Sequence, residues 1–157
     1  MRVCFTGHRK ISPDDVTSLL EALTSLIRQL SEREEITFLA GGAVGFDTLA
    51  ALCVLNERES NKNIRLELIL PCKNQTEKWR DSDIEKYNFI LDCADRSSYV
   101  CEHYTPYCMM QRNRALVDGA DLCVAYLRES KGGTAYTVDY ARSRGVRVIN
   151  LALGEKI

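Results

Sequence analysis

The chain has 157 residues, 45% hydrophobic and 27% charged, with a formal net charge of −1 at pH 7, which predicts one globular domain over residues 1–157. The near-neutral charge disfavours nucleic acid as a partner, because nucleic-acid-binding domains usually carry a basic face, unless the fold gathers a local basic groove. No apolar run approaches the roughly 18 residues of a membrane span and the first residues resemble a core strand rather than a signal peptide, so we expect a cytoplasmic protein without membrane contact.

Strand-like and helix-like segments alternate from one end of the chain to the other. The first strand, about residues 2–6, runs into Gly7-His8-Arg9, which is either a solvated turn or a cation beside an anion site, with His8 also a candidate general base. The first helix follows, with Ser12 as the predicted N-cap and Asp15 in the capping-box position. Its apolar residues recur at the spacing of one helix face: Val16, Leu19, Leu20, Leu23, Leu26, Ile27 and Leu30.

The loop after the second strand, 35–40, is the sharpest motif of the chain. It reads Gly41-Gly42-Ala43-Val44-Gly45-Phe46-Asp47 and opens a helix predicted over 44–59. Its glycines allow a tight turn and close approach of the backbone to a ligand. Asp47 is either a carboxylate that caps the helix, where the helix dipole favours it, or a hydrogen-bond acceptor for a ribose or base.

The middle of the chain contributes two further candidates on predicted helices. The third strand, 64–70, precedes a helix over 75–94 that contains Trp79, which either stacks on a base or packs this helix on the sheet. The fourth strand, 97–102, precedes a helix over 107–118 with Arg112 and Asn113 near its start. These two side chains either recognise phosphate or lie exposed on the helix.

The fifth strand, 121–127, leads to Gly132-Gly133-Thr134, then to a helix over 134–144 and a sixth strand over 146–151. The two glycines allow close approach, and the threonine either caps the helix or donates to a phosphate. Regular alternation predicts an α/β, Rossmann-like doubly wound fold with a mainly parallel six-stranded sheet and helices on both faces. Ligands bind beyond the carboxyl ends of such strands, where the predicted ligand-binding residues gather: Gly7, His8, Arg9, Gly41, Gly42, Ala43, Gly45, Asp47, Trp79, Arg112, Asn113, Gly132, Gly133 and Thr134.

Neither a metal nor a bound cofactor is expected. The seven cysteines include no CxxC pair, and reduced, structural thiols are the expected state. Cys101, His103 and Cys108 offer three ligands, but no further pair completes a tetrahedral set. A GxGxxG dinucleotide fingerprint and a GxxxxGK[ST] phosphate loop are both missing from the sequence.

Four motifs carry a resemblance to a known family: GHR at 7–9, GGAxGxD at 41–47, MxxRN at 109–113 and GGT at 132–134. In this order they resemble the SLOG superfamily, and within it the small YpsA-like, single-domain bacterial proteins. The resemblance covers nearly the whole chain. It implies a Rossmann-like fold and a phosphate-bearing small-molecule ligand, a nucleotide or an ADP-ribose-like species.

The same superfamily contains the LOG phosphoribohydrolases, which release a base from a nucleoside monophosphate and suggest a homodimer, and the DNA-processing protein DprA. Arg112 resembles the arginine of the LOG enzymes' MxxRK-like motif. Their PGGxGTxxE motif is shortened here to Gly132-Gly133-Thr134, and its glutamate is missing, with Asp139 the nearest carboxylate. Whether this chain is an enzyme is therefore left open.

Three functions follow, in order of preference. The first is a module that binds or senses a nucleotide-derived ligand, which needs the loops and Arg112 but no acid–base pair. The second is an N-glycosidase acting on a nucleotide, which needs a carboxylate near the anomeric carbon; Asp47 and Arg112 are then the catalytic candidates. The third, DprA-like DNA binding, is disfavoured by the neutral charge.

Overall fold

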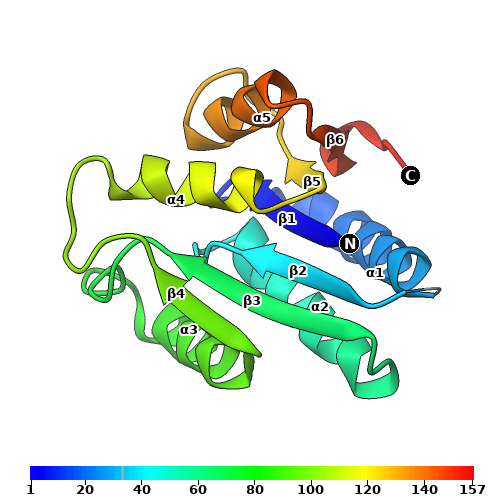
Figure 1. The fold of residues 1–157 in the computed structure, drawn as a ribbon, viewed down its shortest axis with the longest axis horizontal. Helices are drawn as coiled ribbons and strands as arrows, with labels where there is room; N and C mark the ends of the chain where they lie inside the picture. Colours follow the sequence, from blue (N-terminus) through cyan, green and yellow to red (C-terminus); the bar gives the residue numbers. More distant parts are fainter. Residues whose placement is uncertain (33) are drawn as a thin grey trace.

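The computed structural model describes residues 1–32 and 34–157. Its strands form one six-stranded, wholly parallel sheet in the order β4-β3-β2-β1-β5-β6 (Figure 1), which confirms the predicted Rossmann-like fold class. The strands are β1 (Arg2–Gly7), β2 (Ile36–Ala40), β3 (Ile64–Leu70), β4 (Arg96–Tyr99), β5 (Leu122–Tyr126) and β6 (Arg147–Asn150). The α-helices are α1 (Val16–Ser31), α2 (Phe46–Ser60), α3 (Asp81–Cys93), α4 (Cys108–Asp118) and α5 (Gly133–Ser143).

Helices cover both faces of the sheet, α1, α2 and α3 on one and α4 and α5 on the other (Figure 1). Side chains alternate between the two faces of a strand, so each central strand contributes to two cores. Phe5 and Phe38 belong to the cluster beneath α1 and α2, whereas Cys4 and Leu39 belong to the cluster beneath α4 and α5. The central strands β1 and β2 are therefore apolar on both sides, as buried parallel strands are.

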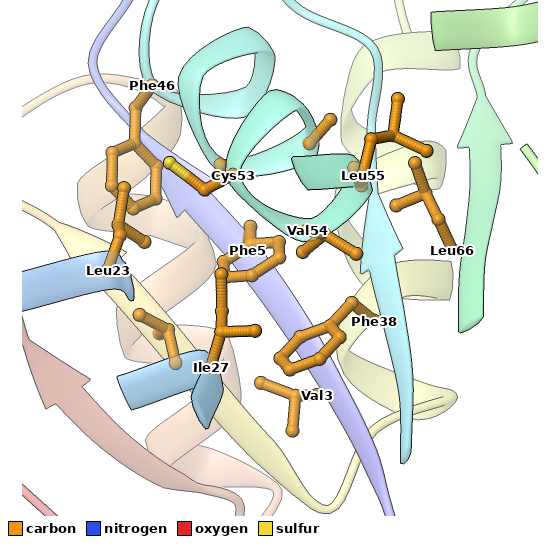
Figure 2. Packing of buried hydrophobic residues seen from close by; sticks show 14 of the residues in the cluster. Val3, Phe5, Leu23, Ile27, Phe38, Phe46, Cys53, Val54, Leu55 and Leu66 are labelled. Atoms are coloured by element: carbon orange, nitrogen blue, oxygen red, sulfur yellow. The ribbon is translucent and has the colours of Figure 1, made fainter. Parts of the chain in front are cut away.

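The larger core holds the start of α2 against the sheet (Figure 2). Phe5 stacks on Phe38 with ring centroids 5.6 Å apart, and Phe46 meets Phe5 edge to face at 6.2 Å. Phe46 is the first residue of α2 and is fully buried. This anchor fixes the position of the neighbouring residue, Asp47, at the carboxyl edge of the sheet.

The order of the strands reverses at β1. Its neighbours are β2 on one side and β5 on the other, because the chain returns through α4 after building β2, β3 and β4 in sequence. In parallel sheets a crevice forms outside the carboxyl ends of the strands at such a point. The loops after β1, β2 and β5 all lie at this edge, since every pairing in the sheet is parallel.

Two local predictions are wrong. The third helix begins at Asp81 rather than near 75, because Arg80 is extended and the preceding residues form turns, in which the Trp79 N–H donates to the Thr76 carbonyl. Asp15 is not part of a capping box, since residues Pro13–Asp15 form a short 3₁₀ turn without a side-chain cap. Its carboxylate instead accepts hydrogen bonds from Tyr126 and Arg128, more than 100 residues away.

Among residues 1–32 and 34–157, the helices are all too short or too polar to cross a membrane.

Candidate functional site

The three glycine loops contact one another directly. The Phe46 N–H at the start of α2 donates to the His8 carbonyl over 3.1 Å. The His8 ring nitrogen Nε2 accepts from the backbone N–H groups of Arg128 (2.9 Å) and Glu129 (3.3 Å), in the loop after β5. His8 thus joins the loop after β1 to both other loops.

Close packing at these junctions explains two of the glycines. Gly45 has a φ of +83°, and a Cβ there would collide with the backbone carbonyl of Arg9. Gly7 leaves room for the ring of Phe46, which a Cβ would strike. These two glycines therefore hold the loops together, and neither position tolerates a side chain without rearrangement.

A cavity of about 300 Å³, here called the central cavity, opens between the end of β1, one face of α4 and the start of α5. Phe5 and Leu116 form apolar parts of its wall. It is lined by most of the residues predicted from the sequence to bind a ligand, namely Gly7, His8, Arg9, Ala43, Asp47, Arg112, Asn113, Gly133 and Thr134.

The central cavity contains a buried ion pair between α2 and α4. Asp47 and Arg112 are only 5% and 6% exposed, and Arg112 Nη1 lies 3.6 Å from Asp47 Oδ2. The same nitrogen donates to the Gly41 carbonyl, while Asp47 accepts from the Ala43 N–H at 3.4 Å. Arg112 Nε is buried without a hydrogen-bond partner among the described residues. Arg112 is therefore not the exposed helical arginine that the sequence left open.

Burial disfavours the charged form of both partners of this pair. It raises the pKa of Asp47, an effect that the neighbouring Arg112 opposes, and it lowers the pKa of Arg112, an effect that Asp47 opposes. An arginine remains protonated in proteins all the same. The positive charge of the Arg112 guanidinium is therefore only partly balanced by Asp47, and an additional anion in the cavity would stabilise it.

Arg9 supplies a second cation at the mouth of the central cavity. It is exposed and forms no ion pair with any residue that the structure describes. Its positive charge opposes the rise that burial causes in the pKa of Asp47, and it adds to the lowering of the pKa of Arg112. The start of α5 lies nearby, where Gly132 has a φ of +99° and no described side chain caps the helix. Free N–H groups at a helix start and two arginines together favour an anionic ligand.

His8 has a structural role at this site that the sequence did not reveal. Its Nε2 already accepts from two backbone N–H groups, and its ring packs edge to face on Tyr126 with centroids 5.9 Å apart. A nitrogen that accepts these bonds takes no proton from a substrate while they persist. The hypothesis of His8 as a general base is therefore not supported by this geometry.

The other predicted residues lie around the central cavity rather than along its wall. Gly41 accepts from Arg112 through its carbonyl, and Gly42 packs against Leu70 and Tyr87. Gly45 and Gly132 occupy the loops just before α2 and α5. Trp79 lines a separate, adjoining cavity.

Sequence reasoning missed the apolar contribution of α4 to the cavity wall. Met109 and Leu116 line the central cavity together with Arg112 and Asn113. Their spacing of three, four and seven residues places all four on one helix face. That spacing is visible in the sequence and identifies this face of α4 once Arg112 is assigned to the site.

The cysteines form no disulfide in the described part of the chain. Within residues 1–32 and 34–157 no cluster of three or more His, Cys, Asp or Glu side chains is arranged to hold a metal ion, including Cys101, His103 and Cys108.

Comparison with protein-family models matches residues 4–148 to the YspA SLOG family. The SPbeta prophage-derived protein YoqJ of Bacillus subtilis is 28% identical over 137 residues, which span 79% of this chain and 80% of that protein. A UPF0398 protein of Halalkalibacterium halodurans is 26% identical over 132 residues, spanning 82% of this chain and 70% of that one.

Two solved structures share the fold. DNA processing protein A from Helicobacter pylori, described as binding single-stranded DNA, superimposes with a TM-score of 0.69 over 96% of this chain and 64% of that one, at 14% identity. The Streptococcus pneumoniae protein of the same name gives a TM-score of 0.69 at 18% identity, over 95% of this chain and 49% of that one. The chain thus spans less than two thirds of either protein, and at this identity the likeness concerns the fold alone.

Proposed function

We propose that this chain, which belongs to the YspA SLOG family, binds a nucleotide-derived, phosphate-bearing ligand in the central cavity. The observation that carries the proposal is the position of Arg112. It is a buried arginine on the cavity wall, paired with Asp47 yet left with an unpartnered Nε. Burying a charge that is incompletely compensated costs stability, and a ligand anion in the cavity would offset part of that cost.

Two further features support an anion beside Arg112. Arg9 adds an exposed positive charge, so that Arg9, Arg112 and Asp47 together carry a net positive charge in the cavity. Gly133 and Thr134 bring the open N-terminus of α5 to the same wall. Backbone N–H groups at a helix start bind phosphate through hydrogen bonds and the helix dipole.

A binding or sensing role fits this site better than hydrolysis. A glycosidase needs a carboxylate that protonates a leaving group or stabilises the reacting sugar carbon. Asp47 is the carboxylate on the cavity wall, and burial raises its pKa as a general acid requires. It is nevertheless engaged by Arg112 and the Ala43 N–H. Nucleotide N-glycosidase activity is the second candidate function, and it rests on this raised pKa.

Isothermal titration calorimetry with ADP-ribose, AMP and inorganic pyrophosphate tests the proposal. We expect at least one of these probes to bind, and Arg9→Met to weaken its binding about tenfold or more, since a charge-assisted hydrogen bond contributes about 1.5–3 kcal/mol. Arg147→Met is the matched control, because Arg147 is an exposed arginine at the start of β6, on the opposite edge of the sheet.

Four results would contradict the proposal or replace it. Absence of binding by all probes would remove it, as would equal weakening by Arg9→Met and Arg147→Met. Chromatographic detection of free adenine from AMP, abolished in an Asp47→Asn protein whose circular dichroism shows that it is still folded, would establish the glycosidase instead. Tight binding of a single-stranded oligonucleotide that ADP-ribose does not displace would favour a DNA-binding role.

A further inference from the structure

A second cavity of about 450 Å³ adjoins the central cavity, and Arg9 and Met109 line both. We name it the tryptophan cavity. Its other walls come from the turns after β3, which contribute Gln75, Lys78 and Trp79, and from Tyr104 in the segment before α4. The two cavities meet at these two shared side chains, so a ligand that spans both would lie beside Arg9.

The tryptophan cavity has the side chains that a nucleobase needs. Trp79 is held in place by Tyr87, whose ring meets it edge to face with centroids 5.6 Å apart. Tyr104 is 59% exposed at the cavity wall. Aromatic rings offer stacking surfaces for the face of a base, whichever base it is.

The turns that carry Trp79 are connected to the glycine loop after β2. Gln75 Nε2 donates to the Gly42 carbonyl over 3.4 Å. The Tyr87 ring also lies next to Gly42, and its hydroxyl is buried without a partner among the described residues. The two cavities therefore share the loop at 41–47 as a common support.

The two cavities differ in the charge and polarity of the side chains that line them. The tryptophan cavity holds Lys78 and Glu77, whose charges cancel, whereas Arg9 at the junction is unpaired among the described residues. The central cavity presents the Asp47–Arg112 pair, Asn113 and Thr134. Donors and acceptors mixed in this way suit hydroxyl groups, which both donate and accept hydrogen bonds.

We propose that the ligand is a nucleoside diphosphate sugar that spans both cavities. The base lies against Trp79 and Tyr104. The diphosphate lies between Arg9, Arg112 and the start of α5, and the sugar lies in the central cavity near Asp47. This inference rests on the proposed function, because it extends the same site, and it adds a separate cavity for the base and the direction in which the ligand lies.

The fluorescence of Trp79 tests it directly, because Trp79 is the single tryptophan of the chain. The probes are ADP-ribose, UDP-glucose and inorganic pyrophosphate, each titrated by calorimetry and by tryptophan emission. We expect at least one of the two nucleotide sugars to change the emission of Trp79 with the same midpoint as its heat signal. Pyrophosphate is expected to bind more weakly and to leave the emission unchanged.

A pair of tyrosine variants provides the matched comparison. Tyr104→Ala should weaken binding of the nucleotide sugar at least about fivefold, by loss of stacking on the base, and leave pyrophosphate binding unchanged. Tyr107→Ala is the control, since Tyr107 is 66% exposed, precedes the same helix and lines neither cavity.

The outcomes separate this inference from the proposed function. Arg9-dependent binding of a nucleotide sugar with unchanged Trp79 emission, and without an effect of Tyr104→Ala, would overturn the tryptophan cavity as base site and leave the central cavity intact. An emission change caused by pyrophosphate alone would likewise count against base stacking. Lack of any heat signal from the three probes would overturn both proposals.

Discussion

At the scale of single residues, the buried pair of Asp47 and Arg112 distinguishes this site. Both residues were identifiable from the motifs in which they stand, but their pairing was not. They are 65 positions apart in the sequence, and only the return of the chain through α4 brings Arg112 to within 3.6 Å of Asp47. Asp47 also stands in the first turn of α2, where the helix dipole favours a carboxylate, and its Oδ2 accepts from the Ala43 N–H in the preceding loop.

Removal of either partner should destabilise the protein, and by unequal amounts. Asp47→Asn leaves a buried guanidinium that cannot lose its proton, so we expect a loss of about 3–5 kcal/mol in the free energy of unfolding. Arg112→Met should cost less, because a buried carboxyl can take up a proton instead. Urea denaturation at pH 7 measures both, with the 77%-exposed Asp139 changed to Asn as the control. An Asp47→Asn protein as stable as the wild type would contradict this account of the pair.

Among the glycines, Gly133 is the one at which a substitution should weaken ligand binding without affecting the fold. A Cβ there would meet only Asn113 Nδ2, at 3.9 Å. We therefore expect Gly133→Ala to keep the melting temperature within a few degrees and to weaken ADP-ribose binding about tenfold, because a methyl group obstructs the approach of phosphate to the start of α5. Unchanged affinity in a folded Gly133→Ala protein would exclude this backbone contact.

Gly42, which like Gly133 is the second residue of a Gly-Gly pair, does not permit this test. Its φ is +68°, and a Cβ would strike the Leu70 side chain. A substitution there is expected to destabilise the fold whatever the ligand does, so a change in binding at Gly42 could not be separated from a change in folding.

At the scale of elements, the loop between β5 and α5 is held by contacts from the start of the chain. Tyr126 and Arg128 both donate to the Asp15 carboxylate, over 2.5 and 2.7 Å. The hydrogen bond from Tyr126, followed by that from Arg128, lowers the pKa of Asp15. Because the carboxylate has a lower pKa in the folded than in the unfolded protein, its stabilising contribution is present above the ordinary pKa near 4 and is lost as the pH falls through the lowered value.

The pH dependence of stability therefore checks this network. The wild-type protein should melt at a higher temperature than Asp15→Asn at pH 7, and the difference should shrink as the pH falls from about 5 to 3. Thermal melts of both proteins across this range measure the effect. A difference that stays constant from pH 7 to pH 3 would show that the Asp15 charge does not support the loop.

His8 also holds the loop between β5 and α5 in place. Loss of the two hydrogen bonds that the Arg128 and Glu129 N–H groups donate to His8 Nε2 should release the segment that leads to Gly133, at about 0.5–1.5 kcal/mol for each bond. We expect His8→Ala to raise the hydrogen-exchange rates of these two amides and to weaken ADP-ribose binding. His8→Gln, whose carbonyl oxygen can accept, should restore part of both. Unaltered exchange in His8→Ala would argue against the loop-holding role.

The elements themselves were largely predictable from the sequence, and the exceptions have local causes. Strands such as β5 are recognisable as short apolar runs, and α1 is recognisable by an apolar stripe along one face. The start of α3 was misplaced because the turns around Trp79 contain residues that also fit a helix, so only the extended backbone of Arg80 reveals the boundary. Asp15 was assigned to a cap because its actual partners, Tyr126 and Arg128, are distant in sequence.

At the scale of the whole molecule, parallel topology explains why residues dispersed along the chain form one site. The reversal of strand order at β1 places the ends of β1 and β5 side by side, with Gly7 paired to Tyr126. The sequence was sufficient to predict this convergence and most of the central-cavity wall. It was insufficient for the division into two cavities, because that depends on how Arg9 and Met109 pack between them.

The most direct test of the central claim is a crystal structure of the protein soaked or co-crystallised with ADP-ribose. Our account predicts phosphate density within hydrogen-bond distance of the Arg9 side chain and the backbone N–H groups of Gly133 or Thr134, in the central cavity. Density at another surface, such as the groove between α1 and the C-terminal residues, with the central cavity empty at saturating ligand, would contradict it.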